Sequence, residues 1–85
     1  MPRISEFFGV VVSVYYNEHG PPHVHVLHGG QGAVLSPAGG VVSGGLSLRA
    51  LRLVREWAAL HRRELRRNWL LARKGHVLER IAPLE

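Results

Sequence analysis

The feature that most constrains this chain is a long segment, from Leu48 to Lys74, that contains neither glycine nor proline. Apolar residues recur along it every three or four positions, which is the spacing of an amphipathic helix. Ser47 before it is a favourable N-cap residue, and Gly75 after it is a favourable helix terminator. The pattern therefore predicts one long amphipathic helix over residues 47–74.

Such a helix is too long for a chain of this size. Its roughly 27 residues would span about 40 Å without a break, whereas a compact domain of 85 residues is only about 30 Å across. Either the helix breaks near His61-Arg62-Arg63, or its end projects and packs on another chain. The second alternative predicts a homo-oligomer or a complex with another protein, with Trp69 on the projecting end as the partner anchor.

Residues 1–46 have the opposite character, because they hold nine of the ten glycines and four of the five prolines. Runs rich in β-branched residues lie between these turn residues and predict an antiparallel meander. The runs are Phe8–Tyr16, His23–His28, Gly32–Ser36 and, more weakly, Val41–Ser43. Residues 75–85 are expected to form a tail or a short strand.

The predicted fold is therefore α+β: a small antiparallel sheet of three to four strands packed against one long helix, in a single domain over residues 1–85. The chain has no cysteine, which excludes disulfides and any cysteine-ligated zinc or iron–sulfur site. No apolar run approaches the length of a membrane span, and no signal-peptide pattern follows Met1. We therefore expect a cytoplasmic protein without a membrane partner.

The chain is basic, because eleven basic residues against six acidic ones give a net charge of +5. Ten of the eleven basic residues are arginine. On a helical wheel the basic side chains gather on one half of the predicted helix, and most apolar side chains gather on the other. The basic half holds Arg49, Arg52, Arg55, Arg62, Arg63, Arg66, Arg67, Arg73 and Lys74. A solvated helix face usually mixes both signs. A solvated surface and a contact with an anion both remain open at this point.

As a binding surface, this stripe would take RNA, DNA or an acidic protein partner. The guanidinium group suits such ligands because it makes planar, bidentate contacts with phosphate and carboxylate. The arginines predicted to contact nucleic acid are Arg52, Arg55, Arg62, Arg63 and Arg66. An affinity that falls steeply with added salt is the expected signature of such binding.

Four of the six histidines lie within ten residues: His19, His23, His25 and His28. His23 and His25 are two positions apart in a predicted strand, so their side chains share one face of the sheet. His19 lies in the preceding turn, and the rigid Pro21-Pro22 pair restricts how it approaches the other two. His28 has the opposite parity and is expected to lie apart.

Several chemistries are open to His19, His23 and His25. Three imidazoles are able to hold a divalent metal such as zinc. Two of them can act as general base and general acid in phosphodiester cleavage, with arginines stabilising the transition-state charge. Protonated imidazoles can also simply bind an anion. A structural or partner-contacting strand face is the remaining interpretation, and the residues alone leave all of these open.

Several segments resemble one bacterial family. They are Ile4-Ser5-x-Phe7-Phe8-Gly9, Tyr15-Tyr16-Asn17-Glu18-His19-x-Pro21-Pro22-His23-x-His25-Val26, Ala50-Leu51-Arg52-Leu53-Val54-Arg55-Glu56-Trp57, Asn68-Trp69-x-Leu71-Ala72 and Ile81-x-Pro83-Leu84. The pattern resembles the domain of unknown function 4160 over nearly the whole chain. The resemblance implies a small protein encoded beside a second small protein, in pairs proposed as toxin–antitoxin-like modules. It implies no established activity.

Together, these features predict a toxin–antitoxin-like component that binds a small protein partner and contacts RNA or DNA through its arginines. His19, His23 and His25 would be the catalytic or phosphate-contacting group, with a ribonuclease-like activity in the catalytic case. The alternative is a non-enzymatic module that binds a divalent metal or serves only protein interaction. The sequence leaves open whether the protein is an enzyme.

Overall fold

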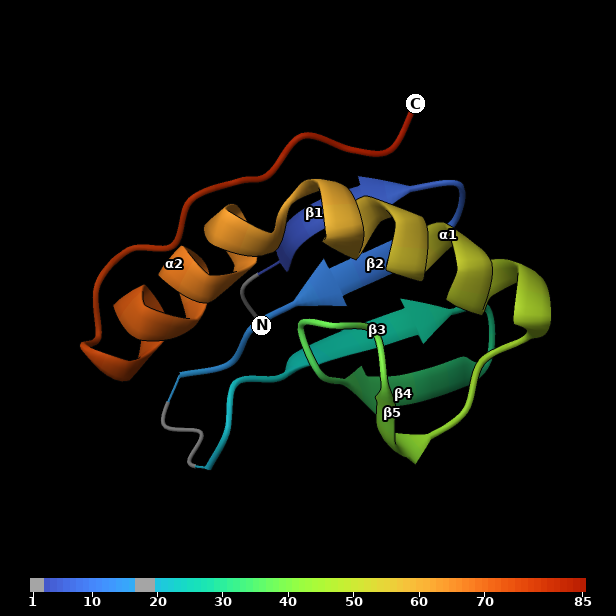
Figure 1. Cartoon of the computed structure of the whole chain (residues 1–85), viewed down its shortest axis with the longest axis horizontal. Coiled ribbons are helices and arrows are strands. Elements are labelled where there is room, and N and C mark those ends of the chain that lie inside the picture. Colours follow the sequence, from blue (N-terminus) through green and yellow to red (C-terminus); the bar gives the residue numbers. More distant parts are fainter. Residues whose placement is uncertain (1–2, 17–19) are drawn as a thin grey trace.

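The computed structural model describes residues 3–16 and 20–85, and these residues form an α+β fold (Figure 1). The described strands are β1 (Arg3–Phe7), β2 (Val10–Ser13), β3 (Val24–His28), β4 (Gln31–Leu35) and β5 (Val41–Gly44). The described helices are α1 (Leu48–Leu60) and α2 (Arg62–Arg73). The predicted fold class is therefore confirmed.

The strands pair in chain order, so β1 to β5 form one antiparallel meander. The predicted meander is confirmed, but the described residues form five strands and not three to four. The additional strand is β1, which the sequence pattern did not predict. A two-residue turn joins β1 to β2, with φ of 47° at Phe8 and 79° at Gly9. Asn-Gly or Asp-Gly is the usual signal for such a turn. Phe8-Gly9 lacks that signal, so the turn was missed and the predicted strand began inside it.

The helical region is two helices and not one long helix, so the alternative of a break near His61-Arg62-Arg63 is confirmed. His61 separates α1 from α2 with φ −123° and ψ 31°, although its N–H still bonds to the carbonyls of Trp57 and Ala58. The break lets both helices fit a molecule whose longest axis is 33 Å. No helix end therefore has to project from the domain, so the helix length no longer indicates an oligomer. Within the described part of the chain, no helix is long and apolar enough to cross a bilayer.

Both predicted ends of the helical region are confirmed. The Ser47 hydroxyl caps α1 by accepting a hydrogen bond from the Ala50 N–H at 3.2 Å. Gly75 ends α2 with a left-handed φ of 73°. Residues 76–85 then form an extended tail that runs back beside the helices (Figure 1). The Asn68 amide holds this tail through two hydrogen bonds of 2.8 Å, one to the N–H and one to the carbonyl of Glu79.

The core lies between the sheet and the two helices. The helices contribute Ala50, Val54, Trp57, Ala58, Leu65, Trp69 and Ala72. The sheet contributes Ile4, Phe7, Val10, Val12, Val24, Val26, Ala33 and Leu35, and Val14 joins them just after β2. Because alternate strand residues face opposite ways, the other face of the sheet carries Ser13, His25, Leu27 and Val34. The buried residues of both described helices pack against the first face, whereas Leu27 on the second face is 44% exposed.

Candidate functional site

Two of the predicted histidines lie side by side at one end of the sheet. His25 belongs to β3, and His23 comes just before that strand. Their ring centroids are 5.3 Å apart, in an edge-to-face arrangement. The centroid of the Tyr15 ring lies 4.3 Å from that of His25, and the centroid of the Trp69 ring lies 4.8 Å from that of His23. The pair is therefore the middle of a row of four rings that runs from the sheet to α2.

A backbone contact orients the His23 ring. Its Nδ1 lies 3.1 Å from the carbonyl oxygen of Pro21. A carbonyl oxygen can only accept, so Nδ1 carries the proton in this hydrogen bond. In the neutral ring Nε2 then carries the lone pair, so it is the nitrogen that can accept a proton, and once protonated it can donate a hydrogen bond to an anion. Both histidines are half-buried.

The third predicted histidine, His19, lies outside the described residues. The predicted metal site and catalytic triplet are therefore only partly placed, by His23 and His25. Within residues 3–16 and 20–85, no three side chains of the metal-binding types come together. A zinc site on this chain would thus need His19, or a ligand from another molecule, beside His23 and His25.

The predicted arginines lie on the exposed faces of the two helices, but they differ in their contacts. Arg55 is engaged by its own fold, because its Nε donates to the Gly39 carbonyl at 2.9 Å. Arg67, on the same face, forms an exposed ion pair with Glu79 at 2.9 Å. The other four predicted arginines are exposed, and the described carboxylates form no ion pair with them. They are Arg52, Arg62, Arg63 and Arg66.

Arg62 and Arg66 are brought close to the histidine end of the sheet. They line a cavity of about 300 Å³ together with Pro22, Pro37 and Ala38. A second cavity of about 360 Å³ is lined by Pro21, Pro22, His23, Val34, Ser36 and Val42. Pro22 is a wall of both, so the two cavities are neighbours. The other predicted arginines, Arg52, Arg55 and Arg63, line neither of them.

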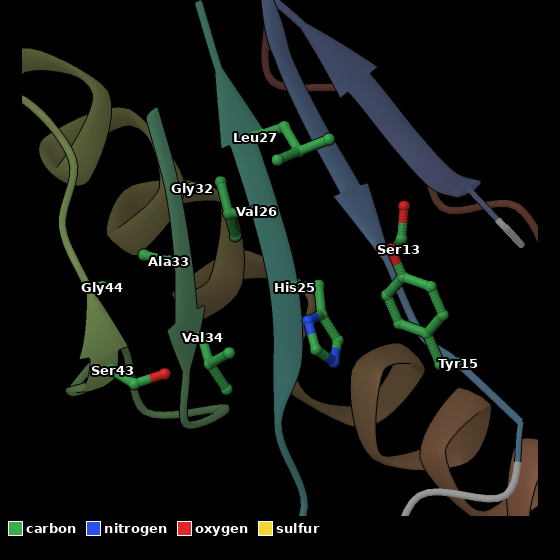
Figure 2. Close-up of a pocket in the computed structure, with 10 residues that line it drawn as sticks. All are labelled: Ser13, Tyr15, His25, Val26, Leu27, Gly32, Ala33, Val34, Ser43 and Gly44. Atoms are coloured by element: carbon green, nitrogen blue, oxygen red, sulfur yellow. The ribbon is translucent and has the colours of Figure 1, made fainter. Parts of the chain in front are cut away.

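Two parts of this site were not predicted from the sequence: the β4–β5 turn and a third cavity. Pro37 and Ala38 belong to the β4–β5 turn, and nothing local predicts that this turn lies beside α2. A third cavity, of about 180 Å³, lies on the sheet face opposite the helices, and His25 and Tyr15 contribute to it (Figure 2). Two glycines at neighbouring positions of β4 and β5, Gly32 and Gly44, are the one signal in the sequence for such a hollow.

Trp69 is not placed to anchor a partner, which is the role that the sequence predicted for it. Its side chain is 3% exposed and belongs to the core. The projecting helix end on which it was to anchor a partner does not exist, because the helix breaks at His61. In this chain Trp69 instead supports the ring of His23.

The model of one protein family matches residues 9–70, and its description is "Domain of unknown function (DUF4160)". The chain belongs to this family. The match includes His23, His25, Arg62 and Arg66 but stops before the C-terminal tail. No curated protein and no solved structure matches the DUF4160 chain.

Proposed function

We propose that this DUF4160 protein is a toxin–antitoxin-like component of the cytoplasm that binds RNA or DNA, with Arg62 and Arg66 holding phosphate groups beside His23. One observation carries the proposal: the arginine cavity and the histidine cavity share the wall formed by Pro22. A polyanion seated on the two guanidinium groups would therefore lie next to an imidazole. Arginine makes bidentate hydrogen bonds to phosphate, and a protonated histidine adds a further positive charge and N–H donor.

The placement of these arginines supports a binding role because it does not favour the stability of the fold. Arg62 and Arg66 are four residues apart, where like charges repel at a cost of about 0.2–0.5 kcal/mol. Arg62 also lies at the start of α2, where the helix dipole disfavours positive charge. A solvated face selected for stability would place acidic residues there.

A second candidate function, phosphodiester cleavage, rests on the 5.3 Å separation of the His23 and His25 rings. In such a reaction one imidazole takes the proton of the attacking hydroxyl, and the other donates a proton to the leaving oxygen. Arg62 and Arg66 would stabilise the charge on the phosphorus oxygens. His19 is a further candidate for either proton-transfer role, as the sequence predicts.

The proposed protein partner is supported by large apolar side chains that this chain leaves exposed. On the helices these are Leu48, Leu60 and Leu70, at 76%, 67% and 49% exposure, and Val77 in the tail is 87% exposed. They replace Trp69 as candidate partner contacts. The non-enzymatic alternative, a divalent-metal module using the same histidines, is tested by elemental analysis of the purified protein. No near-stoichiometric metal would remove that alternative.

Binding of fluorescently labelled oligonucleotides, measured by anisotropy over a range of NaCl concentrations, tests the main proposal. Each phosphate contact on single strands contributes about −0.7 to the slope of log affinity against log salt. The double variant Arg62→Gln, Arg66→Gln should therefore flatten the slope by about 1.4. The matched control is Arg49→Gln, Arg73→Gln, which removes the same charge from outside the cavities and should change the slope less.

A flat salt response of the wild-type protein, or equal losses in both double variants, would overturn the proposal. The catalytic candidate has a separate test. His23→Ala and His25→Ala should abolish both RNA cleavage in vitro and growth arrest on expression in cells. Unchanged cleavage and arrest in these variants would end that candidate and leave the binding proposal standing.

A further inference from the structure

The hollow on the open face of the sheet has a shape that its backbone enforces. It lies over β3, β4 and β5 and measures about 180 Å³ (Figure 2). Gly44 has a left-handed φ of 73°, and a Cβ there would collide with the Gly32 carbonyl. A Cβ on Gly32 would lie 3.1 Å from the Leu27 Cδ2 atom, which is already tight. Backbone therefore forms part of the floor of the hollow, at Gly32 and Gly44, because neither position has room for a side chain.

The rim of the hollow combines rings, apolar groups and hydroxyls. The rings of Tyr15 and His25 stand together on one side, 4.3 Å apart. Leu27 and Val34 supply apolar surface, and Ser13 and Ser43 supply hydroxyl groups. A flat heterocycle with polar edges matches this lining, because its faces stack on rings while its edge atoms accept and donate hydrogen bonds.

The hollow continues toward the phosphate-binding arginines. Val34 lines both the hollow and the His23 cavity, and Pro22 lines both the His23 cavity and the arginine cavity. Three concavities thus follow one path from the open face of the sheet, around its end, to Arg62 and Arg66 on α2. Apolar and aromatic groups line the first part of the path, and positive charge marks its last part.

We propose that this path binds a single-stranded nucleic acid, with one unpaired base in the glycine-floored hollow and the backbone phosphates on Arg62 and Arg66. The inference rests on the proposed function and specifies its ligand. A base within a duplex is paired and stacked, so it cannot enter the hollow. An unpaired base can stack on aromatic side chains, which is how many proteins bind single strands irrespective of sequence. Charge complementarity identifies the rest of the ligand as a polyanion.

The test compares a short labelled uridine oligomer with an abasic oligomer of the same length and charge. Two variants disturb the hollow: Tyr15→Leu removes one ring, and Ser43→Phe fills the space from the exposed edge strand β5. The control Val41→Phe adds the same ring to the same strand at a position that does not line the hollow. Thermal melting and circular dichroism establish that each variant is folded.

The proposal predicts that Tyr15→Leu and Ser43→Phe weaken binding of the uridine oligomer by about tenfold, within the range expected for one stacked base. The same variants should leave binding of the abasic oligomer unchanged, and Val41→Phe should leave both unchanged. A deoxythymidine oligomer that loses affinity to the same extent would support the base site for DNA as well as RNA. A blunt duplex should bind more weakly than the uridine oligomer in the wild-type protein.

Equal losses for the uridine and abasic oligomers would overturn the base site, as would no loss for either. In both cases the salt-dependent binding through Arg62 and Arg66 would still stand, so the failure belongs to this inference alone. Tighter binding of the duplex, insensitive to both hollow variants, would also overturn it. If the wild-type protein binds no oligomer at all, the proposed function fails together with the inference.

Discussion

Replacing Arg62 by glutamate should stabilise the fold and weaken nucleic-acid binding at the same time. Arg62 is exposed in the first turn of α2, where its charge opposes the positive end of the helix dipole. It also repels Arg66 one turn later. A glutamate at this position would instead suit the dipole and pair with Arg66 at i,i+4 spacing, which is the more favourable orientation for such a pair.

The expected change in the free energy of unfolding has two parts, one from the helix dipole and one from the pair with Arg66. Reversing the charge near the dipole is worth about 0.6 kcal/mol at an exposed site, taking the lower end of the known range for each charge. Converting a repulsive i,i+4 pair into an attractive one adds about 0.6 kcal/mol. The free energy of unfolding should thus rise by about 1 kcal/mol at low salt, which raises Tm by about 4–8 °C in a domain of this size.

The assay is thermal unfolding followed by circular dichroism, at low ionic strength and again in about 1 M salt, where screening should remove most of the gain. Arg73→Glu is the matched control. It makes the same change in net charge at the other end of α2, where a negative charge is unfavourable, so it should lower Tm slightly. Arg62→Glu should reduce oligonucleotide affinity more than Arg73→Glu does.

A fall in Tm for Arg62→Glu would contradict the expected stabilisation, because it would mean that Arg62 stabilises the fold through contacts in its cavity. Unchanged affinity would refute the binding role. Arg62→Gln separates the two contributions, since it removes the positive charge without adding a negative one. It should give about half of the stabilisation and most of the loss in affinity.

Three further substitutions test the fold around the site. Asn68→Ala removes both hydrogen bonds to the Glu79 backbone, so it should lower the free energy of unfolding by about 1–3 kcal/mol in chemical denaturation and increase protease cleavage in the tail. Ser5→Ala should leave stability unchanged or raise it by up to about 1 kcal/mol in the same assay, because the buried Ser5 hydroxyl has no hydrogen-bond partner among the described residues. Gly44→Ala should lower Tm markedly, since its Cβ would meet the Gly32 carbonyl from a left-handed backbone; an unchanged Tm would show that β4 and β5 are not packed as described.

The meander and the helical region were predictable because their signals are local. Alternating β-branched residues identify β2 and β3, and the segment without glycine or proline identifies the helices. β1 was missed because its five residues include two charged ones, Arg3 and Glu6, and because its turn lacks the usual residues. The break at His61 has no glycine or proline to mark it, and only the length of the helical segment indicates that a break near this residue is one of two alternatives. Trp57 before the break and Leu65 after it are both buried in the same core, and no local pattern predicts that tertiary packing.

The candidate site was predictable in its residue types but not in its arrangement. The i,i+2 spacing brings His23 and His25 together, as the ring separation of 5.3 Å bears out. Nothing local indicates that Arg62 and Arg66, rather than Arg52 or the other arginines, lie beside them. That selection depends on how the turn at Pro37 lies beside α2, which is a tertiary contact.

The central claim is that the open face of the sheet and the start of α2 bind one single-stranded ligand together. Titration of isotope-labelled protein with an unlabelled uridine oligomer, followed by NMR of the backbone amides, tests it most directly. We expect the signals of His25, Gly32 and Gly44 to shift with the same midpoint as those of Arg62 and Arg66. Shifts confined to the helices, two distinct midpoints, or no shifts in either region would contradict it.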